Sequence, residues 1–251
     1  MDNPHPLIAA STRAFLTLER GEQPRMHHHY AMQLVVRLTD ELYLLGDDDM
    51  PVEGGALIGS QVPHQVMCEG QYLSLCINPT SELGWVMQHQ HGGRVNTVDD
   101  TFVVGLRRDT LAHLKGDLER GQYLSGVVRR MQQYDSRTNV LVQVDELIYR
   151  VLRYLEKRPR QRIVEAELAR FCNISKSQLR SLITRELGTD YESLHRYVRA
   201  RHAVPALGGS SLSRVAERFA FEDGVQLNAA VRDTYGYDAK VLQGMGEMGR
   251  L

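Results

Sequence analysis

The stretch ELARFCNISKSQLRSLITRELG, residues 167–188, constrains the fold more than any other part of the chain. Ala169 is small enough for two helices to touch there, and Asn173, four positions later, tolerates a left-handed backbone. Ser175 is placed to cap a second helix. Apolar residues that could hold this second helix in place follow at Ile174, Leu179 and Leu182. The pattern predicts a helix-turn-helix, an arrangement in which the second helix can enter the major groove of DNA.

The second helix of this pair would expose a polar face. Amide and guanidinium groups can pair with base edges, and hydroxyl and ammonium groups can contact phosphates. We therefore expect DNA contacts from Lys176, Ser177, Gln178, Arg180, Ser181, Thr184 and Arg185.

Charge is distributed unevenly along the chain. The formal net charge is −1, but residues 1–155 carry a net −5 and residues 156–251 a net +4. A basic C-terminal third suits a module that faces phosphates, because neutralising phosphates releases counterions. A net charge of +4 is also compatible with an ordinary solvated surface, so charge alone leaves both interpretations open.

Residues 160–242 resemble the DNA-binding domain of the AraC/XylS family of transcription regulators. That domain carries two helix-turn-helix units joined by one long helix. The first unit and the linking helix follow the family pattern, with Gly188, Arg199 and Ala203 at the expected spacings. The second unit, SLSRVAERFAFEDGVQLNAAVRDTYGYDAKVL, has Ala216, Phe219, Phe221 and Gly236 in register. The resemblance implies double-stranded DNA as the partner.

The second unit departs from the family pattern. Ala220 replaces a glycine, Leu227 replaces an aromatic residue, and Asp238–Ala239 replaces a proline. Glu222 and Asp223 at the start of its reading helix would repel phosphate. We expect the first unit to carry most of the base reading, with smaller contributions from the second unit at Gln226, Asn228 and Arg232.

Two residues of the linking helix carry separate expectations. Pro205 should end or kink that helix, because proline removes a backbone donor and clashes with the preceding turn. Arg199 should act in packing or backbone contacts within the domain, and we do not expect it to read bases.

Residues 12–77 consist of short apolar and β-branched runs separated by turn signals such as GDDDMPVEGG and CEGQ. Many short strands of this kind predict a small double-sheet barrel. The expected fold class is therefore α+β: an N-terminal cupin-like β-barrel with following helices, then an all-α double helix-turn-helix domain.

A histidine cluster lies within the expected barrel. Gly21, His27, His29 and Gln33 have the spacing of a motif that resembles the first metal motif of cupins, G-x5-H-x-H-x3-E, and His64 could supply a third imidazole. Gln33 stands where the motif has a carboxylate, and the barrels of AraC-like regulators generally hold a small organic effector without metal. We favour an effector pocket without metal or other cofactor, and keep a metal site as the alternative. The expected pocket residues are Arg25, His27, His29, Gln33 and His64.

Residues 106–155 change to helical periodicity. The sharpest apolar stripe, which runs from Val140 to Leu155, could cover the domain's own core or pair with a second copy, and we expect a homodimer. The segment EKRPRQR is charged and is broken by Pro159, as in a linker. The expected domains are 1–105 for the ligand-sensing barrel, 106–155 for dimerisation, 156–162 for the linker, 163–242 for DNA binding and 243–251 for a flexible tail.

The composition fits an ordinary globular chain, with 42% hydrophobic and 24% charged residues. No apolar run approaches the roughly 18 residues of a membrane span, and no secretory signal is evident. Three cysteines without a pairing pattern favour a reduced, cytoplasmic setting. The expectation is a transcription regulator controlled by a small-molecule effector, and not an enzyme. The alternatives are a cupin metalloenzyme and a degenerate AraC-like interaction protein that no longer binds DNA specifically.

Overall fold

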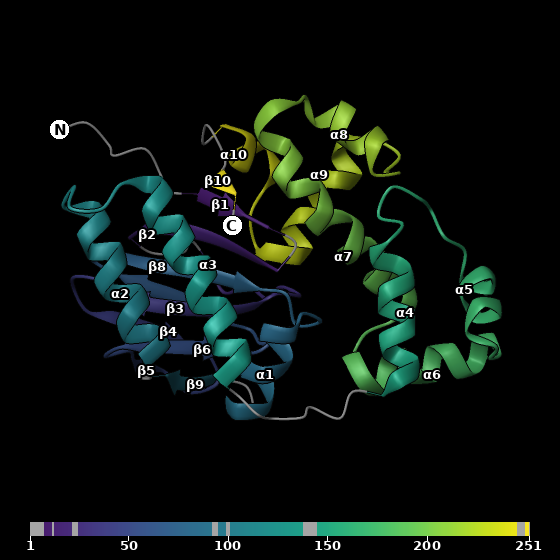
Figure 1. The fold of residues 1–251 in the computed structure, drawn as a ribbon, viewed down its shortest axis with the longest axis horizontal. Helices are drawn as coiled ribbons and strands as arrows, with labels where there is room; N and C mark the ends of the chain where they lie inside the picture. The colour runs from purple at the N-terminus through teal and green to yellow at the C-terminus, as the bar shows by residue number, and fades with distance from the viewer. Residues whose placement is uncertain are drawn as a thin grey trace. The chain divides into compact units, whose positions relative to one another are not determined.

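The computed structural model describes residues 8–11, 13–21, 25–91, 95–98, 101–137, 145–244 and 249–250. The chain divides into two compact units, one made of residues 1–140 with 245–251 and one made of residues 141–244. The first unit combines strands and helices, and the second is helical (Figure 1). The expected α+β class is therefore confirmed. None of the helices in the described ranges is long and apolar enough to cross a membrane.

The described strands of the first unit form two sheets. All strand pairs are antiparallel except the pair β1–β10. The smaller sheet has the order β5 (Met50–Pro51), β4 (Leu42–Leu45) and β7 (Gln65–Cys68). The larger sheet has the order β10 (Gly249–Arg250), β1 (Ile8–Ala10), β2 (Ala14–Arg20), β8 (Gln71–Ile77), β3 (Met32–Arg37), β6 (Gly55–Ile58) and β9 (Val95–Val98).

Where the first unit is described, it also contains the helices α1 (Glu82–His91), α2 (Thr101–Leu114) and α3 (Arg120–Arg137). Side chains of a strand alternate between its two faces, so the central strands of the larger sheet, such as β3 and β8, contribute to two cores. On one face, Leu34 and Leu75 share a buried cluster with residues of α2 and α3. On the other face, Val35 and Tyr72 share a second buried cluster with residues of the smaller sheet. The larger sheet therefore lies between the helices and the smaller sheet, and α2 and α3 run across it in Figure 1.

The second unit contains α4 (Glu146–Glu156), α5 (Glu165–Cys172), α6 (Lys176–Leu187), α7 (Tyr191–Ala203), the 3-10 helix η1 (Val204–Gly209), α8 (Leu212–Arg218), α9 (Gly224–Tyr235) and α10 (Ala239–Gly244). Pro205 lies at the start of η1, directly after α7 ends, so the expected interruption of the linking helix is confirmed. Asn173 ends α5 in the left-handed conformation, with φ 57° and ψ 40°, which confirms the expected turn.

The boundary between the units differs from the one expected from sequence. The expected linker, residues 156–162, lies inside the second unit, and α4 belongs to that unit and not to a separate dimerisation region. The apolar stripe on α4 is buried within its own unit, with Ile148, Val151 and Leu155 each at most 1% exposed. This stripe is therefore not available to a second copy of the chain. The part of the expected stripe at 140–144 lies outside the described residues.

Candidate functional site

The helix α6 is fixed at both ends by its own residues. The Ser175 hydroxyl accepts a hydrogen bond from the Gln178 backbone N–H (3.2 Å), and the Gln178 side-chain oxygen accepts one from the Ser175 N–H (2.9 Å). This reciprocal pair is a capping box, which satisfies backbone donors that a helix leaves unpaired at its start. Gly188 ends the helix in the left-handed conformation, with φ 63°. The inner face buries Leu179, Leu182 and Ile183 against the rest of the unit.

The outer face of α6 is exposed and polar. All seven residues expected to contact DNA are exposed, so the structure brings them to one helix surface: Lys176, Ser177, Gln178, Arg180, Ser181, Thr184 and Arg185. The capping box engages the Gln178 amide oxygen, whereas the amide nitrogen of that side chain takes no part in the box. The signal for this role was present in the sequence, because Ser-x-x-Gln before an apolar run is a capping-box pattern.

Arg180 has an intramolecular partner that the sequence did not reveal. Its Nε and Nη2 atoms donate to the two carboxylate oxygens of Glu165 on α5, at 2.6 and 2.7 Å. The Arg180 hydrogen bond lowers the pKa of Glu165, which keeps that carboxylate ionised. The Arg180 side chain is 67% exposed, so solvent screens the pair and its contribution to stability is small. A phosphate or a base would have to compete with Glu165 for this guanidinium.

The other polar groups at the end of α6 are partly engaged. Arg185 donates to Glu186 at 2.6 Å and to Asp145, the residue that caps α4, at 3.2 Å. The Thr184 hydroxyl donates to the Thr189 carbonyl oxygen at 3.3 Å. Within the described ranges, Lys176, Ser177 and Ser181 make no such hydrogen bond, so they are the most available donors on this helix.

In the second helix-turn-helix, the three residues expected to contact DNA all make hydrogen bonds to neighbouring residues. The Gln226 side-chain oxygen accepts from the Glu222 backbone N–H at 3.0 Å. The Asn228 amide nitrogen donates to Asp238 at 2.8 Å, and Arg232 donates to the same carboxylate. Asp238 is one of the two residues, Asp238–Ala239, that stand where the family pattern has a proline, and its carboxylate pairs with Arg232. The geometry is consistent with a weaker contribution from α9.

Arg199 lies inside the second unit, as expected. It is 7% exposed, and its guanidinium donates to the Ala220 carbonyl oxygen and lies over the Phe221 ring, 4.6 Å from the ring centroid. Ala220 itself has φ 58°, the left-handed conformation that its replacement of glycine makes costly. Arg199 therefore holds a strained turn between α8 and α9 and does not face solvent.

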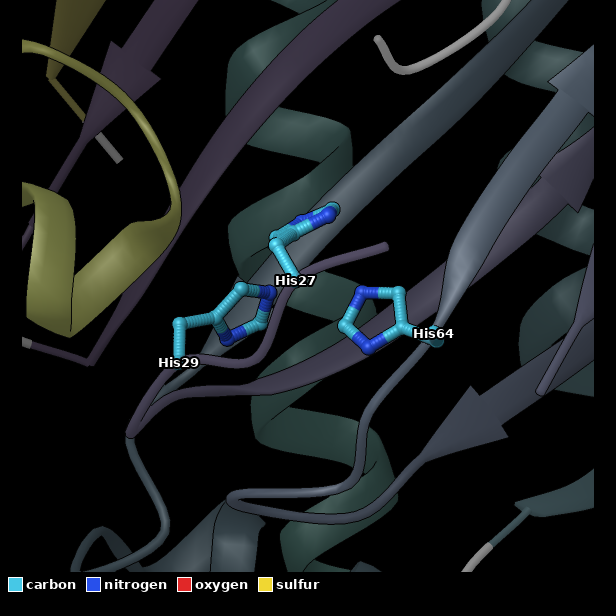
Figure 2. Close-up of side chains that lie close together, drawn as sticks. All are labelled: His27, His29 and His64. Atoms are coloured by element: carbon cyan, nitrogen blue, oxygen red, sulfur yellow. The ribbon is translucent and has the colours of Figure 1, made fainter. Parts of the chain in front are cut away.

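The histidine cluster is a second candidate site, within the first unit. His27 and His29 precede β3, and His64 precedes β7. One ring nitrogen from each of the three lies within 4.8 Å of the others, and Figure 2 shows the three side chains gathered around one space. His29 is 2% exposed and His64 1% exposed. The structure thus brings together the imidazoles that the sequence suggested.

Gln33 is the centre of this cluster. Its side-chain oxygen lies 3.1 Å from His29 Nε2 and 2.8 Å from His64 Nε2, and its amide nitrogen donates to the Ser74 hydroxyl at 2.8 Å. Burial lowers the pKa of His29 to about 4 and that of His64 to about 3, so both rings are neutral near pH 7. Ser74, on β8, had no sequence signal, because it lies 41 residues from Gln33.

Arg25 does not join the cluster through its side chain. That side chain is exposed, and only the Arg25 carbonyl oxygen contacts the group, where it lies 3.0 Å from His27 Nδ1. The expected pocket residues therefore reduce to three histidines and Gln33, with Ser74 added by the structure.

No protein-family model matches the sequence, and no curated protein shows significant similarity to it. This chain is similar to the crystal structure of a single-residue variant of apo ToxT from Vibrio cholerae strain SCE256. The TM-score is 0.59 and the sequence identity is 8%. That match covers 94% of this chain and 99% of the ToxT chain. Wild-type ToxT with an unsaturated fatty acid bound matches with a TM-score of 0.56 and 8% identity, over 94% of this chain and 96% of that chain.

A transcriptional regulator with an AraC-type DNA-binding domain from Chromobacterium violaceum matches 39% of this chain and 90% of its own, with 16% identity and a TM-score of 0.38. The fold is assigned on the ToxT structures, which span nearly the whole chain. At 8% identity these matches show the fold alone: a unit of strands and helices followed by a helical unit, as expected from the sequence.

Proposed function

We propose that this protein is a sequence-specific DNA-binding transcription regulator whose N-terminal unit senses a small effector. The observation that carries the proposal is the exposed face of α6. It presents Lys176, Ser177, Arg180 and Ser181 on a capped helix that follows a left-handed turn at Asn173. A rigid helix with cations and short donors on its outer face is suited to the major groove.

The rest of the proposal follows from the fold. This chain, like ToxT over nearly its whole length, carries a unit of strands and helices besides the unit with the helix-turn-helix. ToxT has been solved with an unsaturated fatty acid bound. By analogy we assign effector binding to the first unit and place the protein in the cytoplasm, where DNA is accessible. A catalytic activity is not part of the proposal. Homodimerisation stays a prediction, and the buried stripe on α4 no longer supports it.

A salt titration tests DNA binding directly. Fluorescence anisotropy of a labelled random duplex at low salt should show binding by the full chain. The double variant Lys176→Ala, Arg180→Ala should bind at least about tenfold more weakly. The slope of its log K against log salt should become shallower by the amount expected for about two lost phosphate contacts. The matched control Arg20→Ala, Lys115→Ala removes two exposed cations from the first unit and should leave both quantities unchanged.

Sequence specificity needs a separate readout. Duplexes recovered from a random pool by the wild-type protein should share a motif, and Arg180→Ala should change that motif at one position. A wild-type protein that does not bind even at low salt would favour the non-DNA-binding interaction protein. Binding that the α6 variant and the control weaken equally would show that α6 is not the reading helix.

A further inference from the structure

The three histidines of the first unit are positioned by the backbone. The backbone N–H of His27 donates to the His64 carbonyl oxygen at 3.0 Å, and the N–H of His64 donates to the His27 carbonyl oxygen at 2.8 Å. This pair of bonds places the two residues side by side, and their rings lie with centroids 4.5 Å apart and planes tilted by 52° (Figure 2). The backbone therefore holds His27 and His64 next to each other, and the rings are further oriented by their own hydrogen bonds.

The ring nitrogens have a common orientation. In each histidine Nδ1 lies against a backbone carbonyl oxygen two residues away, at 3.0, 2.8 and 2.8 Å for His27, His29 and His64. A carbonyl oxygen can only accept, so each Nδ1 carries the proton. A neutral imidazole then has an unprotonated Nε2 with a free lone pair. Nδ1–H donation to a carbonyl is the arrangement that orients histidines for binding a metal through Nε2.

The side-chain amide of Gln33 faces the Nε2 atoms of His29 and His64. An amide has nearly the same shape when its oxygen and nitrogen are exchanged. With the nitrogen towards the rings, Gln33 would donate to His29 and His64 and accept from Ser74, as suits a cluster without an ion. With the oxygen towards both Nε2 atoms, as the structure has it, three lone-pair atoms face one another, and a cation among them would satisfy all three. The two orientations of the amide therefore suit an empty and a metal-bound cluster, respectively.

We propose that His27, His29 and His64 bind a divalent transition-metal ion such as Zn²⁺ through Nε2, with the Gln33 amide oxygen facing the ion. Nitrogen ligands at 2.0–2.1 Å from zinc in a tetrahedral site lie about 3.4 Å apart. The ring nitrogens here are within 4.8 Å of one another, so rotations that move them by about an ångström suffice. A neutral set of three imidazoles and one amide selects ions that prefer nitrogen over Mg²⁺ or Ca²⁺, which prefer carboxylates. The proposal stands independently of DNA binding.

The test is binding of Zn²⁺ and Co²⁺ to the full chain, freed of any purification tag and treated first with a chelator. Isothermal titration with Zn²⁺ should give one ion per chain, and Co²⁺ should give the visible absorption typical of four-coordinate cobalt with nitrogen ligands. Ca²⁺ should neither bind nor displace Co²⁺. His27→Ala and His64→Ala should each weaken binding at least about a hundredfold, because each removes a ligand.

The sequence HHH offers a matched control. His28 lies between two of the proposed ligands but is exposed, so His28→Ala should bind Zn²⁺ as tightly as the wild-type chain. Gln33→Glu supplies a carboxylate at the fourth position and should tighten binding about tenfold or more, a gain that an unfolded variant could not produce. Wild-type binding by His64→Ala, loss of binding by His28→Ala alone, or no tightening by Gln33→Glu would each overturn the assignment.

Discussion

At the scale of single residues, the turn between α8 and α9 stores strain at one alanine. Ala220 has φ 58°, a conformation in which the Cβ atom crowds the following carbonyl, and glycine avoids this cost. Its carbonyl oxygen accepts from Arg199, a bond that glycine would keep. Ala220→Gly should therefore raise the free energy of unfolding by about 1 kcal/mol, measured by urea denaturation of the full chain.

An alanine in ordinary helical conformation provides the control. Ala229 lies on the exposed side of α9, where glycine adds only backbone freedom to the unfolded chain. Ala229→Gly should lower the free energy of unfolding by about 1 kcal/mol, the opposite sign from the same substitution at Ala220. Equal signs at the two positions would contradict the argument from backbone strain.

The ion pair between Arg180 and Glu165 makes a second prediction at this scale. Glu165→Gln replaces the carboxylate with a neutral amide, so Arg180 becomes free to contact phosphate or base. The affinity for a random duplex should rise about threefold to tenfold, and the salt dependence should steepen by about one phosphate contact. Glu53→Gln removes the same charge from an exposed position of the first unit and should change neither quantity. An unchanged salt dependence in Glu165→Gln would show that Arg180 does not contact a phosphate.

At the scale of helices and strands, most of the fold could be predicted from local patterns. The strands β2, β3, β4, β6, β7 and β8 fall in the expected runs, because alternation and turn residues act over a few positions. The turn at Asn173 and the break at Pro205 were predicted for the same reason. The very short strands β5 and β10 carry too few residues for a periodic signal.

The candidate site was less predictable, because its partners come from distant elements. Glu165 lies 15 residues from Arg180, and Ser74 lies 41 residues from Gln33. The common exposed face of the seven residues of α6 could be predicted, because helical periodicity alone determines it. Whether each of them is free depends on tertiary contacts that no local pattern records. The same limit applies to α4, whose apolar stripe suited a dimer or its own core equally well, and the structure uses it for the core.

The helix α7 buries a titratable group that should make stability depend on pH. His195 is 2% exposed, and burial, together with the nearby Arg199 charge, lowers its pKa to about 4 from 6.5. Between pH 6.5 and 4 the unfolded chain therefore binds a proton that the folded chain excludes. This contribution is absent above pH 6.5 and destabilises the folded state progressively as the pH falls to 4, by on the order of 3 kcal/mol in total.

Urea denaturation above and within this pH window measures the effect. His195→Gln removes the titrating group and should reduce the loss of stability on acidification. His28→Gln, at an exposed position, should lose stability as the wild-type chain does. Identical pH dependence in the wild type and His195→Gln would mean that the buried imidazole does not carry this term.

At the scale of the whole molecule, the two sites belong to separate compact units, so any regulation must appear as a free energy that couples them. If Zn²⁺ in the histidine cluster acts as the effector, it changes the dissociation constant for DNA by some factor, and DNA must change the dissociation constant for Zn²⁺ by the same factor. The two factors can be measured independently, by anisotropy with and without Zn²⁺ and by Zn²⁺ titration with and without duplex.

Variants of the two units should separate binding from coupling. His64→Ala should bind duplex but lose its response to Zn²⁺, whereas Lys176→Ala, Arg180→Ala should bind Zn²⁺ as the wild type does but lose the response of Zn²⁺ affinity to duplex. If neither ligand changes the dissociation constant of the other, the ion in the first unit is structural, and the protein needs a different effector. Unequal factors would break the linkage relation and would mean that one of the ligands also binds elsewhere, because two ligands at two sites on one chain share a single coupling free energy.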